Sequence, residues 1–551
     1  MKKIGADILI ECLKEQGVTT VFGYPGGTVL DIYDALYRDG TIEHVITSHE
    51  QGAAHAADGW ARVTGKTGVV IATSGPGATN LVTGIATAYM DSVPLVAITG
   101  NVGANFLGRD SFQEIDIFGV TLPITKHNYI VKDVNELAGV VREAFRIANS
   151  GRRGPVLIDI LKNVQSAEAD YEPQKPLPAR RKSVPARDLE AVAKALAAAQ
   201  RPLIMAGGGV IASEASKELV ALAEKLDAPV VSTLMGLGAF PASHPLFMGM
   251  IGMHGTATAA KLCLESDCIV ALGARFSDRV ALNRDKFAQG KTVIHIDIDE
   301  AELDKNVTAT YKVLGDIKEA LSTLIPMLKE KKRPFSETAK KYRAEEKAKD
   351  TAPELGHRIL IEAAKAAPKD VIVVTDVGQH QMWTAQYFPI EKPRTLCTSG
   401  GLGTMGYGLG AAIGAAKATG KHVVLVTGDG CFNMNLNELS TAVTEELPIT
   451  ILLMNNHALG MVRQWQKLFY GNRFSQTNVR KKTDYVKFAE SFGATGLVIE
   501  KDEDIVPALT TAFALNTPVV VDCRISNDEN VLPMIKPGAT YDTIITNWEE
   551  K

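Results

Sequence analysis

Short apolar runs rich in β-branched residues recur along this chain, and they restrict its fold more than any other feature. Clear examples are Val69–Ala72, Ile269–Leu272, Val293–Ile296, Val423–Val426 and Val519–Val521. Continuous apolar runs of this length are typical of strands buried on both faces, as in parallel sheets. Helical patterns separate the runs. We therefore predict an α/β protein in which helices cover both faces of doubly wound parallel sheets.

The length of 551 residues is too great for one hydrophobic core, and about three domains are expected. Two segments have the composition of linkers. Gln165–Arg187 carries four prolines, and Lys329–Leu355 is a charged run in which the signs alternate. These segments divide the chain into an N-terminal domain (1–165), a central domain (185–335), a C-terminal domain (355–530) and a tail (531–551).

The composition is that of a water-soluble globular protein, with 46% hydrophobic and 22% charged residues and a formal net charge of −4. Such a balance predicts neither nucleic-acid nor membrane binding. The six cysteines form no CxxC pair, which favours free thiols in a reducing, cytoplasmic compartment. Two uncharged stretches, 68–90 and 395–416, are interrupted by glycine clusters, so we expect strand–turn–helix units there. An acidic Asp7 near the start argues against a signal peptide.

A pair of motifs near the C-terminal end predicts a metal site. Gly428-Asp429-Gly430 follows one apolar run, Asn455-Asn456 follows the next, and 24 residues, Cys431 to Met454, lie between them. The carboxyl ends of parallel strands meet at one edge of a sheet, where ligands bind. Oxygen ligands from Asp429 and Asn456 can hold Mg²⁺ and, through it, a diphosphate. The pair resembles the metal–diphosphate motif of thiamine diphosphate (ThDP) enzymes, whereas a lone GDG would favour a plain strand-to-helix turn.

Two further predictions concern the surroundings of this motif. Asn435–Glu438 has the pattern of a helix N-cap with a reciprocal acid, so we expect a helix to start there, close to the diphosphate. Val69–Gly77 resembles Val423–Gly430, which suggests that the N-terminal and C-terminal domains share one fold.

Glu50 is the candidate for the carboxylate that ThDP chemistry needs. It follows a short strand pattern and begins an alanine-rich helix. A carboxylate that hydrogen-bonds the aminopyrimidine ring favours the tautomer whose exocyclic nitrogen accepts the proton of the thiazolium carbon. The alternative interpretation is an acid that interacts with the helix dipole. Met405, between glycines, is the candidate for the apolar contact that keeps the cofactor bent; the alternative is core packing.

Nearly the whole chain resembles the catalytic large subunit of the acetohydroxyacid (acetolactate) synthases, a family of ThDP-dependent enzymes. The matching segments are Phe22–Gly27, Ser48–Gln51, Thr73–Asn80, Ser111–Glu114, Gly252–Gly255, Gly378–Trp383, Gly428–Gly430 and Gly460–Gln466. The resemblance implies pyrimidine-binding, central FAD-type and diphosphate-binding domains of the decarboxylase and carboligase type.

The resemblance also implies roles for individual residues. Glu50 would activate the cofactor, and Asp429, Asn456 and the carbonyl of Ala458 would bind Mg²⁺. Contacts to ThDP would come from Gln379, His380, Met405, Gly428, Gly430 and Met461. Gly26, Phe112, Gln113 and Lys162 would approach from the N-terminal domain. Arg279 would receive the carboxylate of the second 2-oxo acid, and Trp465 would shape the pocket for its side chain.

Biosynthetic members of the family also carry FAD. The resemblance implies contacts from Arg152, Gly207, Gly208, Gly209, Asp297 and the stretch from His254 to Arg275. An ordinary α/β turn is an equally good interpretation of the glycines alone. The sequence departs from the family pattern at Arg275–Arg279, where Ser277 replaces an aspartate.

The predicted function is therefore ligation of pyruvate, after decarboxylation, to a second 2-oxo acid in branched-chain amino acid biosynthesis. The family builds each site between two subunits, which implies a homodimer or homotetramer, and a small regulatory subunit is a further partner. Alternatives are a catabolic acetolactate synthase without FAD, a pyruvate oxidase, a pyruvate decarboxylase, or a non-catalytic nucleotide-binding regulatory protein.

Overall fold

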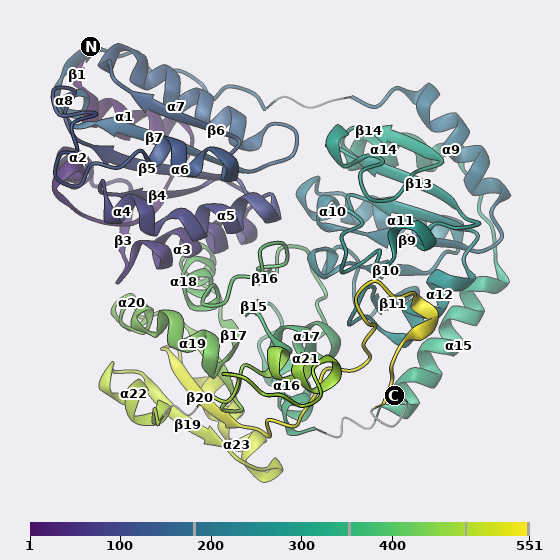
Figure 1. The fold of residues 1–551 in the computed structure, drawn as a ribbon. Coiled ribbons are helices and arrows are strands. Elements are labelled where there is room, and N and C mark those ends of the chain that lie inside the picture. The colour runs from purple at the N-terminus through teal and green to yellow at the C-terminus, as the bar shows by residue number, and fades with distance from the viewer. Residues whose placement is uncertain (180–182, 351–353, 480–481, 548–551) are drawn as a thin grey trace.

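The computed structural model describes residues 1–179, 183–350, 354–479 and 482–547, and these residues form three α/β domains (Figure 1). Each domain contains a six-stranded parallel sheet within the described residues, and a two-stranded sheet of β1 (Lys2–Ile4) and β8 (Glu168–Asp170) joins the first domain. The prediction of three doubly wound α/β domains is confirmed.

The sheet of the first domain has the strand order β3-β2-β4-β5-β7-β6. Its strands are β2 (Thr20–Tyr24), β3 (Glu43–Ile46), β4 (Gly68–Ala72), β5 (Leu95–Asn101), β6 (His127–Val131) and β7 (Pro155–Leu161). The helices are α1 (Gly5–Glu15), α2 (Leu30–Asp39), α3 (Glu50–Thr64), α4 (Pro76–Asn80), α5 (Val82–Asp91), α6 (Ile117–Thr121), α7 (Val134–Asn149) and α8 (Lys162–Ser166), with single 3₁₀ turns η1 (Gly27–Val29) and η2 (Leu122–Ile124).

The middle domain has the order β11-β10-β9-β12-β13-β14. Its strands are β9 (Pro202–Ala206), β10 (Val230–Ser232), β11 (Phe247–Met250), β12 (Cys268–Leu272), β13 (Thr292–Asp297) and β14 (Tyr311–Leu314). The helices are α9 (Ala186–Ala198), α10 (Gly208–Ala212), α11 (Ser216–Leu226), α12 (Ala257–Glu265), α13 (Arg284–Phe287), α14 (Ile317–Leu324) and α15 (Pro334–Lys349), with 3₁₀ turns η3 (Leu234–Gly236), η4 (Glu300–Glu302) and η5 (Ile325–Met327).

The third domain has the order β16-β15-β17-β18-β20-β19. Its strands are β15 (Ile372–Thr375), β16 (Leu396–Thr398), β17 (Val423–Gly428), β18 (Ile449–Asn455), β19 (Thr495–Ile499) and β20 (Val519–Arg524). The helices are α16 (Leu355–Ala366), α17 (Gln379–Tyr387), α18 (Gly408–Thr419), α19 (Asp429–Asn435), α20 (Leu439–Thr444), α21 (Gly460–Phe469), α22 (Tyr485–Ser491) and α23 (Asp502–Ala514), with the 3₁₀ turn η6 (Leu436–Glu438).

The first and third sheets have the same strand order when each is numbered along its own sequence. The predicted internal repeat is thus confirmed as a repeat of topology. In both sheets the first strand along the chain lies between the second and the third. The connections therefore leave the middle of the sheet in opposite directions, and a crevice opens above the carboxyl ends of those strands.

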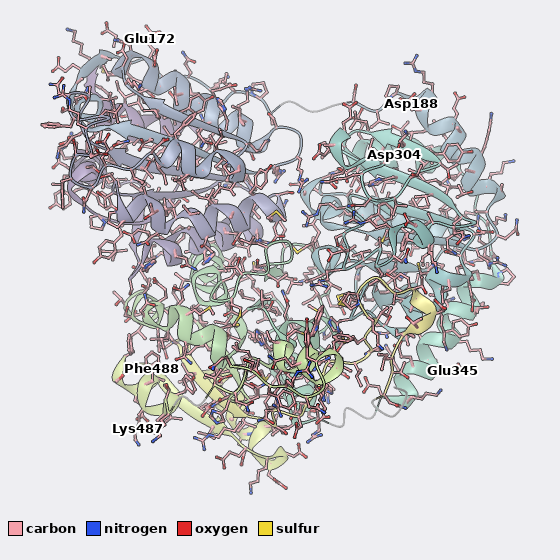
Figure 2. The ribbon with its side chains drawn as sticks, viewed as in Figure 1. Glu172, Asp188, Asp304, Glu345, Lys487 and Phe488 are labelled. Carbon is pink, nitrogen blue, oxygen red and sulfur yellow. The ribbon has the colours of Figure 1, made fainter. Side chains whose placement is uncertain are left out.

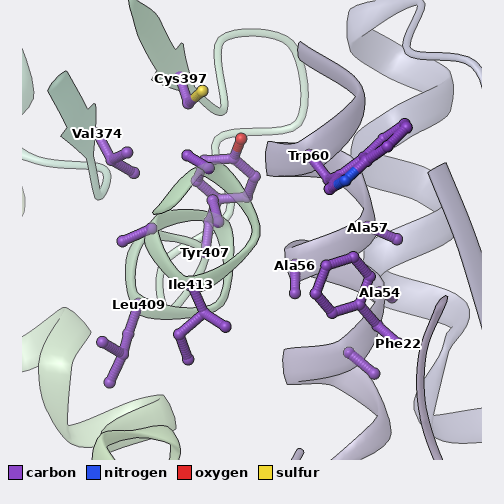
Figure 3. Packing of buried hydrophobic residues seen from close by; sticks show 14 of the residues in the cluster. Phe22, Ala54, Ala56, Ala57, Trp60, Val374, Cys397, Tyr407, Leu409 and Ile413 are labelled. Atoms are coloured by element: carbon purple, nitrogen blue, oxygen red, sulfur yellow. The ribbon is translucent and has the colours of Figure 1, made fainter. Parts of the chain in front are cut away.

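Helices α3 and α18 join the first domain to the third (Figure 3). Their contact is lined by alanines and glycines, and a Cβ atom on Gly414 would lie 1.8 Å from the carbonyl oxygen of Ala56. Glycine is required here because any side chain would push the helices apart. Trp60 and Tyr407 fill the space beside this contact. The close packing fixes α3, and therefore Glu50 at its first position, relative to the third domain.

The segments between the domains are partly ordered against them. Gln165 lies in α8 and residues 168–170 form β8, while 171–179 run without helix or strand. Within the charged segment Lys329–Leu355, α15 packs Phe335 and Ala339 against the middle domain. Charged side chains such as Glu172, Asp188 and Glu345 are exposed (Figure 2).

The C-terminal segment crosses from the third domain back to the middle one, as the yellow trace in Figure 1 shows. Ile535 and Tyr541 are buried in the hydrophobic cluster of the middle domain, and η7 (Tyr541–Thr543) lies there. The Tyr541 hydroxyl donates to the carbonyl oxygen of Val280 at 2.5 Å. None of the helices in the described part of the chain has the length and apolar content needed to cross a bilayer.

Candidate active site

The carboxyl edge of the first sheet brings together four of the predicted site residues. Gly26, Glu50, Gln113 and Lys162 follow β2, β3, β5 and β7, respectively. Lys162 Nζ donates to the carbonyl oxygen of Gly27 at 2.8 Å. A Cβ atom on Gly75 would lie 2.9 Å from Cβ of Gln113, so the loops after β4 and β5 touch. The neighbouring Phe112 is 87% exposed.

Glu50 occupies the first position of α3, as its sequence context predicts. The preceding His49 caps this helix, since its Nδ1 accepts a hydrogen bond from the Gln51 amide at 3.0 Å. The Glu50 carboxylate accepts one from Asn80 Nδ2 at 2.9 Å, and its Oε1 is close to Gly77. Because Glu50 is only partly buried, this carboxylate can still accept a hydrogen bond from a ligand.

The carboxyl edge of the third sheet holds the predicted metal ligands. Asp429 follows β17 and Asn456 follows β18, and both side chains are buried. Among the described residues Asp429 Oδ1 has no hydrogen-bond partner. Burial raises the pKa of Asp429 to about 6. A buried carboxylate oxygen without a partner is costly, so this observation fits a site that a cation completes.

The Asn456 side chain is held on both sides. Its Oδ1 accepts from the Ala458 amide at 3.0 Å, and its Nδ2 faces Gln379 Oε1 at 3.3 Å. The turn between Asn456 and Ala458 is tight, because His457 has a φ of 53°. These contacts fix the amide orientation and bring the Ala458 backbone next to it.

Gln379 and His380 open α17 beneath this edge. A Cβ atom on Gly428 would lie 3.1 Å from the His380 ring, and one on Gly460 would lie 2.0 Å from Gln379 Oε1. Burial lowers the pKa of His380 to about 3, so the ring is neutral. Both glycines are thus required by close packing around the predicted diphosphate position.

The helix near this edge begins earlier than predicted. It starts at Asp429, directly after β17, and Asn435 is its last residue. The predicted pairing of Asn435 with Glu438 as a helix cap is wrong. Glu438 Oε2 instead accepts from the Ser48 amide of the first domain at 3.1 Å. The reason is tertiary: Glu438 is fully buried against Gly52, where it meets the loop that precedes Glu50.

A cavity of about 2220 Å³ lies between the three domains. From the third domain it is lined by Gly378, Met405, Met461 and Trp465. The Met405 methyl group approaches Gly430, since a Cβ atom there would lie 3.6 Å from it. This wall of the cavity therefore continues to the sheet edge that carries the predicted metal ligands.

The middle domain contributes the opposite wall, which contains His254 and Arg279. The Arg279 guanidinium lies over the Trp465 ring, 5.5 Å from its centroid. Arg279 is also 3.8 Å from Asp278, and its side chain is 57% exposed. Burial lowers the pKa of His254 to about 4, and its Nδ1 has no partner among the described residues.

Further along the same cavity lies the carboxyl edge of the middle sheet. Gly207–Gly209 follow β9, Gly273 and Arg275 follow β12, and Asp297 ends β13. In this sheet the strand order reverses between β9 and β12, which is where nucleotides bind in such sheets. Here a Cβ atom on Gly207 would lie 2.0 Å from the Gly273 carbonyl oxygen.

Arg152 and Arg275 enter this part of the cavity from two domains. Arg152 pairs with Glu302 at 2.7 Å and with Asp299 at 3.3 Å. Arg275 Nη1 donates to the carbonyl oxygen of Met90 at 2.6 Å. The predicted cofactor contacts Arg152, Gly208, His254, Arg275 and Asp297 all line this one cavity.

Four of the predicted residues of the first domain lie elsewhere. Of the residues that the structure describes, those lining the cavity do not include Gly26, Glu50, Gln113 or Lys162. A single chain thus carries two separate groups of predicted site residues. One group is on the carboxyl edge of the first sheet, and the other lies around the cavity on the third and middle domains, together with Arg152.

Several buried polar residues at this site were not identified from the sequence. Asp91 accepts from the amides of Gly400 and Gly401, and Asp376 accepts from the amide of Gly406 at 2.8 Å. Gln464 accepts from Gln379 Nε2 at 3.0 Å. An acid at the C-terminal end of a helix, such as Asp91, opposes the helix dipole. This unfavourable position is the feature of the sequence that could have indicated a special role for Asp91.

Models of three thiamine pyrophosphate enzyme domains match this chain. The N-terminal TPP binding domain matches residues 3–120, the central domain 189–324, and the C-terminal TPP binding domain 376–523. These ranges contain most strands of the three parallel sheets.

Curated relatives match over almost the full chain. The acetolactate synthase large subunit of Corynebacterium glutamicum is 47% identical, with 98% of this chain and 90% of the relative covered. A probable acetolactate synthase large subunit of Methanocaldococcus jannaschii is 45% identical, covering 98% and 95%. The large subunit of acetolactate synthase isozyme 2 of Escherichia coli is 44% identical, covering 98% and 99%.

The fold, the two polar sheet edges and the domain matches place this chain among the thiamine diphosphate enzymes. Within that class, the chain belongs to the acetolactate synthase family and is similar to its large subunits over nearly its whole length.

Proposed function

We propose that this chain decarboxylates pyruvate and joins the remaining two-carbon unit to a second 2-oxo acid. The products would be 2-acetolactate from pyruvate and 2-aceto-2-hydroxybutyrate from 2-oxobutyrate, as needed for branched-chain amino acid synthesis. The observation that carries the proposal is the buried, unpartnered Asp429 oxygen beside Asn456, at the edge of a domain whose family binds ThDP.

Asp429, Asn456 and the backbone carbonyl of Ala458 would hold Mg²⁺, which neutralises the diphosphate. Oxygen donors of this kind suit Mg²⁺, and Gln379 fixes Asn456 in place. Gly428 and Gly430 leave room for the phosphate groups. Met405 and Met461, both on the cavity wall, would support the bent cofactor by apolar contact.

When bound, ThDP supplies the carbon nucleophile that adds to the keto carbon and accepts the electrons released as CO₂ leaves. Glu50 would hydrogen-bond the aminopyrimidine and so set its proton-accepting tautomer. Gln113 and Lys162 lie on the same edge as Glu50 and would face the substrate from that side. Arg279 would bind the carboxylate of the second 2-oxo acid, while Trp465 limits the room for its side chain.

Two separate groups of site residues in one chain support a site built from two copies. The edge that carries Glu50 would close over the Asp429 edge of a second subunit, which makes the active unit a homodimer or a homotetramer. The relatives are named large subunits, and we propose a small regulatory subunit as a further partner.

The middle-domain part of the cavity would hold FAD. Gly207 and Gly208 lie at the reversal point of the sheet, and Asp297 ends β13. Arg275 offers positive charge, and Arg152, paired with Glu302 and Asp299, lines the same part of the cavity. His254 has an unpartnered buried nitrogen in the same cavity. In this reaction FAD would do no net redox work, so its role would be structural.

The products test the proposal directly. The protein is incubated with pyruvate, 2-oxobutyrate, ThDP and Mg²⁺, and both acetohydroxy acids, acetaldehyde, oxygen uptake and bound flavin are quantified. Acetohydroxy acids should dominate, with flavin bound and no oxygen consumed. Acetaldehyde as the main product, or oxygen uptake in proportion to CO₂, would contradict the proposal.

Complementation tests the two-copy site. Glu50→Gln and Asp429→Asn variants are each expected to be inactive. In a hybrid dimer, one of the two sites receives both intact residues. An equimolar mixture that exchanges subunits should therefore regain about one quarter of the parent activity. A mixture that remains inactive after proven exchange would show that each site is built within one chain.

A further inference from the structure

The loop Ser399–Met405 joins β16 to the start of α18 and forms part of the cavity wall. It carries Met405, which the proposed function places against ThDP. Three of its residues are glycines (Gly400, Gly401 and Gly403), so its own sequence does little to fix its shape. Within the loop, the Thr404 amide donates to Ser399 Oγ at 3.0 Å, and further restraint comes from other parts of the molecule.

The end of the loop is held by its own domain, through Asp376, which accepts from the Gly406 amide. The start is held by the first domain. Asp91 Oδ1 accepts from the Gly401 amide at 2.7 Å, and Asp91 Oδ2 accepts from the Gly400 amide at 3.0 Å. A Cβ atom on Gly401 would lie 2.9 Å from Asp91 Oδ1, so the loop can approach Asp91 only because glycine stands there.

Asp91 is the last residue of α5, where its charge opposes the helix dipole. Its side chain is 0% exposed, and it pairs with Arg62 Nη2 at 2.9 Å. Arg62 also pairs with Asp58 at 2.5 Å, and the Tyr407 hydroxyl donates to Asp58 at 2.7 Å. One guanidinium thus faces two buried carboxylates, and the loop amides supply the remaining donors. Breaking such a network leaves a buried charge uncompensated.

A second contact from α5 reaches the same loop. Thr87 Oγ1 lies 2.7 Å from Thr404 Oγ1, and it also donates to the carbonyl oxygen of Thr83 at 2.9 Å. Because the Thr87 proton is used toward Thr83, Thr404 is the donor between the two hydroxyls. Helix α5 therefore contacts the loop at Gly401 and again at Thr404, the residue directly before Met405.

We infer that Asp91 and Thr87 are positioning residues that set the conformation of the Ser399–Met405 loop and thereby the affinity of the third domain for ThDP. This inference rests on the proposed function of Met405. Asp91 tolerates its unfavourable place at the end of a helix because the loop amides and Arg62 compensate its charge. Local rules are most often broken at functional positions.

The chain contains a closely matched control. Glu15 is the last residue of α1, and it pairs with the buried Arg142 at 2.8 Å. It also accepts from the Tyr171 hydroxyl at 2.5 Å and from the Gln174 amide at 2.8 Å. Like Asp91 it is an acid at a helix C-terminus with an arginine, a backbone amide and a nearby tyrosine, but none of its partners belongs to the Ser399–Met405 loop.

The experiment measures ThDP binding calorimetrically at saturating Mg²⁺ and the thermal midpoint for four proteins: the parent, Asp91→Asn, Thr87→Val and Glu15→Gln. The asparagine keeps the shape of Asp91 but offers one acceptor oxygen in place of two, so one loop amide loses its partner. We expect the dissociation constant for ThDP to rise about tenfold in Asp91→Asn and about threefold in Thr87→Val. Glu15→Gln should bind like the parent, even where its midpoint falls as far as that of Asp91→Asn.

Parent-like affinity in Asp91→Asn, or an equal loss of affinity in Glu15→Gln, would overturn the inference. If Asp91→Asn does not fold, the nearly isosteric Thr87→Val decides by the same measurement. Failure of the proposed function looks different, because the unsubstituted parent would then take up no ThDP at all.

Discussion

Arg279 and Trp465 come from different domains, yet the guanidinium carbon of Arg279 lies 5.5 Å from the centroid of the Trp465 ring. Arg279 follows β12 of the middle domain, and Trp465 belongs to α21 of the third. A guanidinium over an indole face is attracted by the ring, by about 0.5–1 kcal/mol at an exposed site. The pair therefore places a cationic group next to a flat apolar wall.

Trp465→Leu should weaken discrimination between acceptors, because the indole limits the space beside Arg279. Recognition of one methylene in an apolar pocket is worth about 1–3 kcal/mol. We expect the preference for 2-oxobutyrate over pyruvate to change by roughly tenfold. The measurement is the ratio of the two acetohydroxy acids formed in competition. Trp465→Phe keeps an aromatic face toward Arg279 and should retain much of the preference; an unchanged ratio in Trp465→Leu would remove Trp465 from the acceptor pocket.

Glu50→Gln should leave ThDP affinity within a few-fold of the parent while turnover falls by about 10²–10⁴-fold, because an amide cannot take the place of the carboxylate in proton transfer. Steady-state rates and calorimetric binding measure the two effects separately. Glu136→Gln is the control, since Glu136 is also an acid in the first turn of a helix, α7. If both variants lost stability but kept turnover, the role of Glu50 would be limited to stabilising the N-terminal end of α3.

Much of the architecture could be predicted because its signals are local. The apolar runs at 69–72 and 423–426 are contiguous in sequence, and each became a central strand of a parallel sheet. Asp429 and Asn456 could be paired because adjacent parallel strands end at the same edge, and β17 does pair with β18. Topology alone therefore brings the two side chains together.

The residues that were not identified depend on contacts between distant segments. The hydrogen bond between Asp91 and Gly400 joins positions 309 apart in the sequence. The sequence pattern predicts a local cap for Glu438, but its partner, Ser48, belongs to another domain. The sequence does not reveal whether a polar side chain hydrogen-bonds to a neighbouring residue or to one in a distant segment. Such positions are found only once the domains are placed together.

Gln464→Leu should raise the Mg²⁺ concentration needed for half-saturation. Gln464 accepts from Gln379, and Gln379 in turn accepts from Asn456. Gln464 also exchanges two hydrogen bonds with the Val531 backbone, at 2.9 and 3.0 Å. Loss of a residue that orients a metal ligand costs about 10–100-fold in metal affinity, and we expect the lower end because Glu529 still supports Gln379.

Titration of metal-depleted protein with Mg²⁺, followed by ThDP binding, measures this change. Asn128→Leu is the control, because Asn128 also donates from a buried amide, to the carbonyl oxygen of Phe118 and to Thr121, but lies far from the metal edge in sequence and domain. If both variants needed the same Mg²⁺ concentration, Gln464 would not act on Mg²⁺ binding through Gln379 and Asn456.

Asp159 should make the protein less stable as the pH rises from mildly acidic to neutral. This residue of β7 is 1% exposed, and burial raises its pKa to about 7, while hydrogen bonds from Thr99 and Asn101 act in the opposite direction. In the unfolded chain an aspartic acid has a pKa of about 3.9. Between these values the folded protein holds a proton that the unfolded chain has released, so unfolding gives up a proton.

The stability contribution of Asp159 is therefore fully present below about pH 4, falls by roughly 1.4 kcal/mol per pH unit through the window, and levels off above about pH 7. Asp159→Asn cannot ionise and should escape this loss. The thermal midpoint of Asp159→Asn minus that of the parent should therefore increase from pH 5 to pH 8. Because every other titrating group is common to both proteins, a gap that stays constant across this range would mean that Asp159 keeps an ordinary pKa in the folded state.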